Sequence, residues 1–600
     1  MTKTTRQGIF QPKTLALAVS LGIAAPAYAV NFNIGEVEGQ FDSSMSIGAS
    51  WSTTDRDMDL VGSANGGTGY TQTGDDGRLN FKKGETFSKI FKGIHDLELR
   101  YRDSGAFIRG KYWYDFELKD ENRLFKDISD SNRKEAAQSS GAQILDAFLY
   151  HNYYLGELPG TVRVGKQVVS WGESTFIGNS INAINPLDAA AFRRPGAEIK
   201  EGLIPVNMLY VSQSLSDRLS MEAFYQLEWD QTIADNCGTF FSSADVVADG
   251  CDSNYNILGA AAVNNLLALP AATRAALGID VEREGLLVSR GGDRDARDSG
   301  QYGLAMRWLG DATEYGLYAM NYHSRTPNLN MRNAGRASIL AAISPGTSAL
   351  AQPILLSNGE YFLEYPEDIR LYGASFSTTL PTGTAWSGEI SYRPNLPVQI
   401  NTTDMTGRLA TSVAGAAAAA GGGLAGAAAA LGTAGREHKG YNRKEVTQVQ
   451  TTFTHFIDQV LGAGRVTLVG EVGYTHVGGL ESKSDLRYGR DSIYGLDTPE
   501  YGNDGFVTAN SWGYRLRALA DYSNVFAGVN LTPNVSFSHD VNGYGPNGLF
   551  NEGSKAVSVG IDAVYQNAYT ASLSYTDFFG GDYNTLVDRD FLALSVGMNF

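Results

Sequence analysis

The sequence is poor in basic residues, cysteine, proline and tryptophan. Its 600 residues contain 48 Lys and Arg against 65 Asp and Glu, and the resulting net charge of −17 excludes the basic surface of a nucleic-acid-binding protein. Only 2 Cys, 17 Pro and 7 Trp accompany 69 Gly, 31 Tyr and 27 Phe, a composition unlike that of most helical enzymes. Because 43% of the residues are hydrophobic, the chain is not a wholly disordered polypeptide either.

Long apolar runs are missing as well. After residue 29, no stretch of large apolar residues reaches the roughly 20 positions that a transmembrane helix needs. The uncharged segment 410–435 consists almost entirely of Ala and Gly, so it gains little free energy by entering lipid. We interpret it as a mobile or weakly helical outer loop, with a lipid-inserted helix as the alternative.

The first 29 residues are typical of a secretory signal peptide. Lys3, Arg6 and Lys13 accompany a short apolar stretch that ends in Ala-Tyr-Ala, a small-x-small cleavage site. A buried N-terminal helix would not explain the basic flank. We therefore expect cleavage after Ala29 and export of residues 30–600 as one outer-membrane barrel domain.

The exported part alternates between apolar and polar residues with a period of two. In residues 108–117 the even positions are Ile, Gly, Tyr, Tyr and Phe, whereas the odd positions are Arg, Lys, Trp, Asp and Glu. The same pattern recurs in 221–230, 512–522 and 529–538. It indicates β-strands with one apolar and one polar face. A soluble β-sandwich also alternates, but the aromatic residues at the ends of these apolar faces favour a wall that meets lipid.

Eighteen such segments can be counted, and the connections between them are alternately long and short. Their approximate bounds are 41–53, 93–102, 106–117, 143–154, 161–170, 206–213, 219–230, 301–309, 314–324, 368–378, 384–393, 445–456, 464–477, 511–522, 528–540, 556–566, 568–577 and 590–600. Short turns on one side, long loops on the other and an even strand number are typical of an outer-membrane β-barrel.

We therefore predict an all-β fold, a transmembrane antiparallel β-barrel of about 16–18 strands in the outer membrane of a Gram-negative bacterium. The barrel must be closed because every backbone polar group has to be paired inside lipid. At roughly 16–18 strands the interior is too wide for the wall's own side chains to fill, so it is a water-filled channel unless a loop obstructs it.

The polar strand faces supply charged side chains that we expect to line this lumen. They are Glu98, Arg100, Arg109, Lys111, Asp115, Glu117, Glu222, Glu228, Arg307, Glu389, Arg393, Glu471, Arg515, Arg517 and Asp521. Charges of both signs suit a selectivity field across a pore. For most single residues we favour the other interpretation, a solvated wall in which opposite charges neutralise one another across neighbouring strands.

Two loops contain further signals. Loop 171–205 mixes apolar residues with charged ones, so it either folds into the lumen as a constriction or lies over the mouth. In loop 231–300, residues 270–277 start with Pro and are followed by Gly278, which predicts a short helix.

Cys237 and Cys251 lie in the same long loop, which the strand topology places outside the cell. Exported proteins experience oxidising conditions, so we predict a disulfide that closes a loop of about 15 residues.

Motifs for catalysis or metal binding are weak. The seven His show no metal-ligand spacing, and residues 172–176 lack the final Gly of a nucleophile elbow. Three Asp residues within 290–298 do not fit the EF-hand pattern, and the interleaved Arg residues favour a salt-bridged loop. We predict no catalytic residue, no cofactor and no metal site.

The last strand ends in an amphipathic pattern. Leu594, Val596, Met598 and Phe600 alternate with small or polar residues. This ending resembles the signal that the outer-membrane barrel assembly machinery reads. We therefore expect that machinery as a partner, together with the lipid of the outer membrane.

Several short motifs carry a wider resemblance. They are Val164-Gly165-Lys166-Gln167, Ser170-Trp171-Gly172-Glu173-Ser174, Asn182 to Pro186, Arg194-Pro195-Gly196 and Asp298-Ser299-Gly300-Gln301-Tyr302-Gly303. Over most of the exported chain they resemble a large family of proteobacterial outer-membrane barrels known only as a domain of unknown function. The Arg-x-Gly-Lys-Gln element is also similar to one in alginate-export barrels. The resemblance implies a periplasmic partner, an RND-type inner-membrane transporter, and a role with lipid-like or hydrophobic compounds, but no catalytic residues.

The resulting hypothesis is a porin-like transport channel that moves small hydrophobic organic or lipid-like molecules across the outer membrane, coupled to periplasmic and inner-membrane partners. The alternative is a ligand- or partner-binding barrel without an open pore. An outer-membrane phospholipase or protease is a third class, but the sequence shows no anchored Ser–His pair, so we expect no enzyme.

Overall fold

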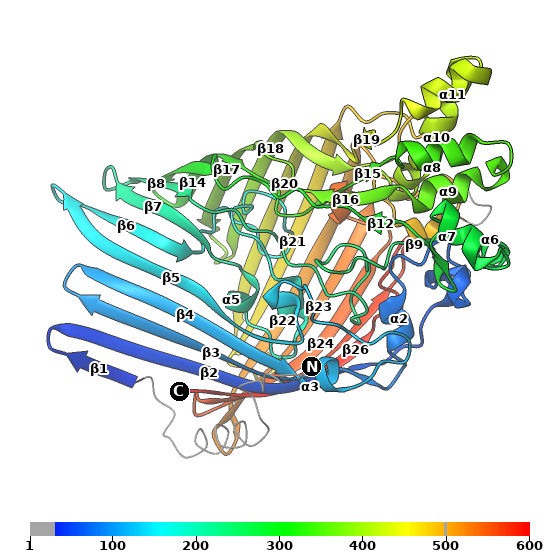
Figure 1. The fold of residues 1–600 in the computed structure, drawn as a ribbon. Coiled ribbons are helices and arrows are strands. Elements are labelled where there is room, and N and C mark those ends of the chain that lie inside the picture. The colour runs from blue at the N-terminus through cyan, green and yellow to red at the C-terminus, as the bar shows by residue number, and fades with distance from the viewer. Residues whose placement is uncertain (1–29, 497–500) are drawn as a thin grey trace.

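A single antiparallel sheet closes on itself to form the body of the molecule (Figure 1). The computed structural model describes residues 30–496 and 501–600, so the predicted signal peptide lies outside the described residues. The barrel has 18 strands. They are β2 (Val37–Ser52), β3 (Thr86–Tyr101), β4 (Ser104–Asp115), β5 (Ser140–Leu155), β6 (Leu158–Gln167), β7 (Val206–Ser214), β8 (Leu219–Gln226), β13 (Tyr302–Leu309), β14 (Thr313–Tyr322), β17 (Ile369–Thr379), β18 (Ala385–Gln399), β20 (Tyr441–Asp458), β21 (Arg465–Gly478), β22 (Asn510–Phe526), β23 (Val529–Asn542), β24 (Lys555–Tyr565), β25 (Tyr569–Phe579) and β26 (Phe591–Asn599).

Each of the eighteen predicted segments corresponds to one of these strands, so the predicted fold is confirmed. The bounds differ most at the start of β3 and at the end of β18. β3 begins at Thr86, before the predicted 93, and β18 ends at Gln399, after the predicted 393. β8 ends at Gln226, before the predicted 230. β8 ends early because Trp229 turns inward, packs on Tyr365 and donates its indole N–H to the Ser324 carbonyl at 3.1 Å.

The first and last barrel strands close the wall. β26 pairs with β2 from Ser44 opposite Asn599 to Ser52 opposite Phe591. The Ser43 N–H then donates to the Phe600 carbonyl at 2.7 Å. A short extra strand, β1 (Val30–Ile34), forms a hairpin with the start of β2 and continues along the edge where β26 stops.

The two faces of the wall differ as the sequence predicted. Apolar side chains on one face remain accessible, for example Ile108 (41% exposed), Leu149 (61%) and Val596 (50%). Charged side chains on the other face, such as Lys111 and Glu471, are buried inside the barrel. A closed antiparallel barrel with an apolar exterior is built to cross lipid, and the protein is an outer-membrane β-barrel of a Gram-negative bacterium.

The long loops carry helices and two small sheets at one end of the barrel, to the right in Figure 1. The helices in these loops and in the β6–β7 connection are α2 (Asp76–Asn80), α3 (Phe116–Asp120), α4 (Ala189–Arg193), α5 (Ile199–Gly202), α6 (Ala260–Leu267), α7 (Ala271–Leu277), α8 (Arg336–Ile343), α9 (Ala351–Ser357), α10 (Thr402–Ala419) and α11 (Gly423–Leu431). The short strands are β9 (Asn256–Ile257), β10 (Val281–Glu282), β11 (Gly285–Leu287), β12 (Ser289–Arg290), β15 (Asn328–Arg332), β16 (Glu360–Glu364) and β19 (Glu437–His438).

Two sequence predictions concern these loops. The helix predicted to end at Gly278 is confirmed as α7, and Gly278 adopts the left-handed conformation (φ +62°) that ends it. The Ala- and Gly-rich segment forms most of α10 and α11, so it is more regular than the weakly helical loop that we expected. No single described helix is long and apolar enough to cross a membrane; only the bent pair of α8 and residues 348–357 meets the length and composition test when taken together.

Candidate functional site

The connection between β6 and β7 runs through the inside of the barrel. Residues 168–205, here called the luminal segment, contain α4 and α5, and Figure 1 shows α5 within the barrel outline. The segment contacts strands on opposite sides of the wall, including β3 and β4 on one side and β18 and β21 on the other. The sequence left open whether this loop enters the lumen or covers the mouth, and the structure places it in the lumen.

Glu471 on β21 holds the first part of the luminal segment. Its carboxylate accepts the backbone N–H groups of Thr175 at 2.9 Å, Phe176 at 2.7 Å and Ile177 at 2.7 Å. It also accepts the Thr452 hydroxyl at 3.1 Å, and the Glu471 side chain is fully buried. Successive N–H groups that point at one carboxylate form a nest for the negative charge.

Glu389 on β18 provides a second attachment next to the first. It accepts the Glu173 N–H at 2.5 Å and the Ile181 N–H at 3.3 Å. Arg393, also on β18, donates to the Ser180 carbonyl at 3.3 Å. We call Glu389 and Glu471 the carboxylate latch, because both hold backbone of the luminal segment rather than a cation.

Two buried lysines hold the later part of the luminal segment. The Lys111 Nζ atom on β4 lies 2.9 Å from Asp188 Oδ2, and both side chains are almost fully buried. The Lys92 Nζ atom on β3 lies 2.5 Å from Glu201 Oε1. Asp188 also caps α4 by accepting the Ala191 N–H at 3.0 Å. Breaking a buried pair leaves an uncompensated charge, so these contacts strongly favour the seated position of the segment.

Apolar contacts connect the luminal segment to the loops above it. Trp171 is 1% exposed, its ring lies 5.1 Å from that of Phe224, and its indole N–H donates to Glu222 Oε2 at 2.7 Å. Trp171, Ile181 and Ile184 belong to a buried apolar cluster that extends into the helices at the barrel mouth. The luminal segment is therefore part of a packed layer across the channel and not a loosely tethered loop.

The predicted lining residues fall into two groups. Those that contact the luminal segment are Lys111, Glu222, Glu389, Arg393 and Glu471. Those with partners within the wall are Glu98, Arg100, Arg109, Arg307, Arg515 and Asp521. Arg517 is exposed on the inward face of β22. Their part in a permeation path stays a prediction.

Three of the predicted lining positions differ from the expectation. Asp115 is the last residue of β4 and caps α3 by accepting the N–H groups of Glu117 and Leu118. Glu117 lies in α3 and pairs with Lys89 at 2.6 Å, so placing it on a strand face is wrong. Glu228 lies beyond the end of β8, because the chain turns inward at Trp229. β4 and β8 both stop earlier than the alternation suggests.

Sequence reasoning missed the partners Lys92, Asp188 and Glu201. Lys92 preceded the predicted strand because residues 86–92 do not alternate clearly. The structure explains this weak alternation, because the inward residues Ile90 and Ile94 are buried and not exposed to solvent. The sequence did contain one signal for this partner: Lys92 is a charged residue between the apolar residues Ile90 and Ile94 on the same strand face.

The structure also brings hydroxyl and imidazole groups together on the outer face of the wall. Ser43 Oγ lies 2.8 Å from His95 Nδ1, and similar pairs join Ser104 to His151 and Thr384 to His455. A nucleophilic serine needs its histidine oriented by a third group. Within the described residues, no carboxylate is hydrogen-bonded to the His95 ring, so the pair is a satisfied side-chain contact and not a triad. The described ranges also contain no group of three or more His, Cys, Asp or Glu that could hold a metal ion.

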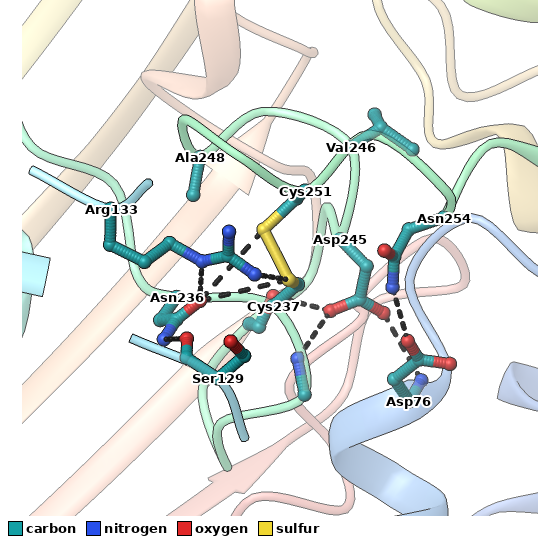
Figure 2. The surroundings of a disulfide bond; sticks show 12 residues. Asp76, Ser129, Arg133, Asn236, Cys237, Asp245, Val246, Ala248, Cys251 and Asn254 are labelled. Atoms are coloured by element: carbon teal, nitrogen blue, oxygen red, sulfur yellow. Dashed lines mark hydrogen bonds between the residues drawn. A yellow bond between two sulfur atoms is a disulfide. The ribbon is translucent and has the colours of Figure 1, made fainter. Parts of the chain in front are cut away.

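The predicted disulfide is present in the loop between β8 and β13. Figure 2 shows Cys237 bonded to Cys251, with the Arg133 guanidinium donating to Cys237 Sγ at 3.2 Å and to Asn236 Oδ1 at 2.5 Å. Arg133 belongs to the loop between β4 and β5, so the disulfide loop is attached to a neighbouring loop of the mouth.

A group of buried carboxylates lies beside this disulfide. Asp245 accepts the Asp76 backbone N–H at 3.1 Å and the Gly238 N–H at 2.9 Å, and Asp76 accepts the Asn254 amide at 2.6 Å (Figure 2). Burial raises the pKa of Asp76 to about 7, and the nearby Asp245 charge adds to the rise. Burial also raises the pKa of Asp75 to about 6. These carboxyls link the loops of the mouth, and burial disfavours their charged forms.

We expect the loops of the mouth to be more firmly ordered at pH 5 than at pH 8. The folded pKa values of Asp75 and Asp76 exceed those of the unfolded chain, so the folded loop binds more protons, and its free energy of unfolding falls as the pH rises from about 4 to 7. Limited proteolysis should cut residues 70–80 at least about tenfold faster at pH 8 than at pH 5. Asp76→Asn should remove most of this difference, whereas Asp55→Asn, at an exposed carboxyl, should keep it. A pH-independent cutting rate in the wild type would contradict the prediction.

Comparison with known proteins gives one family and several structures. No curated protein matches the chain. The outer-membrane protein OpdK of Pseudomonas aeruginosa has a TM-score of 0.39 at 10% identity, with 94% of this chain and 98% of OpdK covered. OccAB2 of Acinetobacter baumannii has a TM-score of 0.39 at 8% identity, with 93% and 98% covered. OmpF of Salmonella typhi has a TM-score of 0.33 at 9% identity, with 95% and 100% covered.

The sequence itself identifies the family. Residues 11–600 match a family described as "Protein of unknown function (DUF1302)". The match covers nearly the whole chain. The family resemblance read from the short motifs is thereby confirmed. The protein is a closed outer-membrane barrel with a segment seated across its lumen, and it belongs to the DUF1302 family.

Proposed function

We propose that this protein is an outer-membrane channel for small hydrophobic organic molecules, gated by the luminal segment. The observation that carries the proposal is the mode of attachment of residues 168–205. The segment crosses the lumen without joining the barrel sheet, and the carboxylate latch and the two lysine pairs hold it. An obstruction that side-chain contacts hold inside a complete wall can act as a gate, because those contacts can be broken without opening the barrel sheet.

The mouth of the barrel supports the hydrophobic class of substrate. A cavity of about 310 Å³ lies between the loops, and its lining includes Tyr70, Tyr255, Ile257, Leu258 and Leu356. Cavities of this size with mostly apolar walls are typical of sites for small organic ligands. Below the mouth, the apolar cluster continues to Trp171 in the luminal segment.

The proposal includes delivery to, or receipt from, a periplasmic protein coupled to an RND-type inner-membrane transporter. The family resemblance supports this part. Cross-linking in native membranes followed by purification of the barrel tests it, and a barrel that is recovered without a periplasmic protein speaks against it.

Planar-bilayer conductance tests the channel itself. Deletion of residues 175–204 leaves a short connection between Gln167 and Val206, which are direct neighbours in the sheet. We expect the wild type to conduct weakly or intermittently and the deletion variant to conduct steadily. Deletion of residues 423–431, which removes α11 at the mouth, is the control and should leave the wild-type behaviour unchanged.

The alternative function, a ligand-binding barrel without a pore, makes the opposite prediction. In that case the 175–204 deletion would fold and insert but would still not conduct. That result would overturn the channel proposal.

A further inference from the structure

One region of the lumen contains a cation that the wall does not neutralise. Arg163 on β6 lies opposite Tyr150 of β5 and Tyr210 of β7, on the inward face. Its guanidinium carbon is 4.1 Å from the centre of the Tyr210 ring and 5.6 Å from that of Phe148. Throughout residues 30–496 and 501–600, no carboxylate forms an ion pair with Arg163.

The acidic group that lines this region together with Arg163 already has partners. Glu98 on β3 accepts both the Nε and the Nη2 of Arg100, at 2.8 and 2.7 Å, and also the Tyr150 hydroxyl at 2.9 Å. Arg109, which lies over Phe107, pairs with Asp96 at 2.7 Å. The other described arginines of this part of the wall are thus neutralised, and Arg163 is not.

The groups around Arg163 line a hollow of about 410 Å³. Its lining includes Glu98, Phe107, Phe148, Tyr150, Arg163 and Tyr210. The Phe107 and Phe148 rings lie 5.5 Å apart and form one apolar side. Gly105, opposite Tyr150, makes room for that ring, because a Cβ atom there would lie 2.3 Å from the ring carbon Cζ.

The hollow lies on the periplasmic side of the luminal segment along β6. Arg163 precedes the start of that segment by five residues along β6, on the periplasmic side. Tyr210 is paired in the sheet with Phe224, whose ring contacts Trp171 of the segment. Aromatic side chains therefore continue from the segment to the hollow.

We propose that this hollow binds the carboxylate of an organic acid with an apolar body, with Arg163 holding the anion and Phe107, Phe148 and Tyr210 holding the body. A guanidinium binds a carboxylate through two parallel N–H bonds, and stacking on Tyr210 fixes its plane. The proposal rests on the proposed function, since it names the class of molecule that the channel passes.

Binding of 2-naphthoate to the detergent-solubilised full chain tests this site, with the neutral 2-naphthamide as the matched probe. We expect naphthoate to bind more tightly than naphthamide in the wild type. Arg163→Gln should weaken naphthoate binding by at least about tenfold and leave naphthamide binding unchanged, because a hydrogen bond to a charged group contributes that much. Phe148→Ala should weaken the binding of both probes, because it removes part of the apolar wall.

Arg517→Gln is the matched control. Arg517 also faces the lumen, but it lies on β22, across the barrel from β6, and outside the hollow. We expect this variant to bind naphthoate like the wild type. Equal losses in the Arg163 and Arg517 variants, or equal binding of the two probes by the wild type, would overturn the proposal.

Folding and conduction separate this test from that of the channel. Arg163→Gln should keep the heat-modifiable migration of the folded barrel. The site fails if naphthoate binding does not depend on Arg163, whereas the channel fails if the 175–204 deletion does not conduct.

Discussion

Replacement of Glu471 by Ala is expected to release residues 175–177 from the wall. Three backbone N–H groups would lose their common acceptor, a carboxylate whose side chain is fully buried. A hydrogen bond to a charged group contributes about 1.5–3 kcal/mol, so the loss of all three should cost the seated position at least about 3 kcal/mol relative to a released one. That difference corresponds to a roughly hundredfold larger released population.

Cysteine labelling measures this population. Ile177 is 3% exposed, and Ile177→Cys would carry the only free thiol because both native cysteines form the disulfide. A maleimide that does not cross membranes should label this thiol about a hundredfold faster when Glu471→Ala is also present. Asp521→Ala is the control, since that carboxylate accepts the Thr532 hydroxyl on the wall. If both carboxylate variants label at the same rate, Glu471 does not hold the segment.

Replacement of Lys111 by Met is expected to produce the second large effect. It leaves the fully buried Asp188 carboxylate without its cation, and breaking a buried pair in this way costs about 3–5 kcal/mol. The temperature at which the folded barrel converts to its slow-migrating form should fall clearly. Lys83→Met is the control, because Lys83 and its partner Asp55 are both exposed, at 55% and 84%, and such pairs contribute about 1 kcal/mol or less.

A double variant separates the loss of the pair from a loss of packing. Asp188→Asn removes the charge but keeps the Oδ1 acceptor that caps α4 at Ala191. When this change is combined with Lys111→Met, no buried charge is left unpaired, so we expect part of the lost stability to return. A double variant as unstable as Lys111→Met alone would show that the ion pair is not the cause.

The wall of the barrel could be predicted from the sequence because most strands have one face toward lipid and the other toward the polar interior. In β4, Ile108 faces lipid while Arg109 and Lys111 face inward, so the period of two is strong. The period of two fails where inward residues meet neither lipid nor water but are packed against other parts of the protein. Ile90 and Ile94 of β3 face inward but are buried within the barrel, and the strand was therefore predicted seven residues too short.

The site could be predicted only in part. Glu389 and Glu471 were placed on the inward face because their strands alternate, but their partners are backbone N–H groups of a distant segment. Nothing periodic in residues 168–205 indicates which wall residues they meet. The position of the segment depends on contacts between residues far apart in the sequence, and those contacts are set by the closed barrel.

The junction between the first and last barrel strands has a consequence for biogenesis. β2 and β26 meet only after the whole polypeptide is available, and the luminal segment touches both, since Ser44 donates to Glu198 at 3.2 Å and Gly196 packs on Ser595. The inner surface of the junction is therefore incomplete until residues 196–198 arrive. We therefore expect closure of the barrel and seating of the luminal segment to depend on each other.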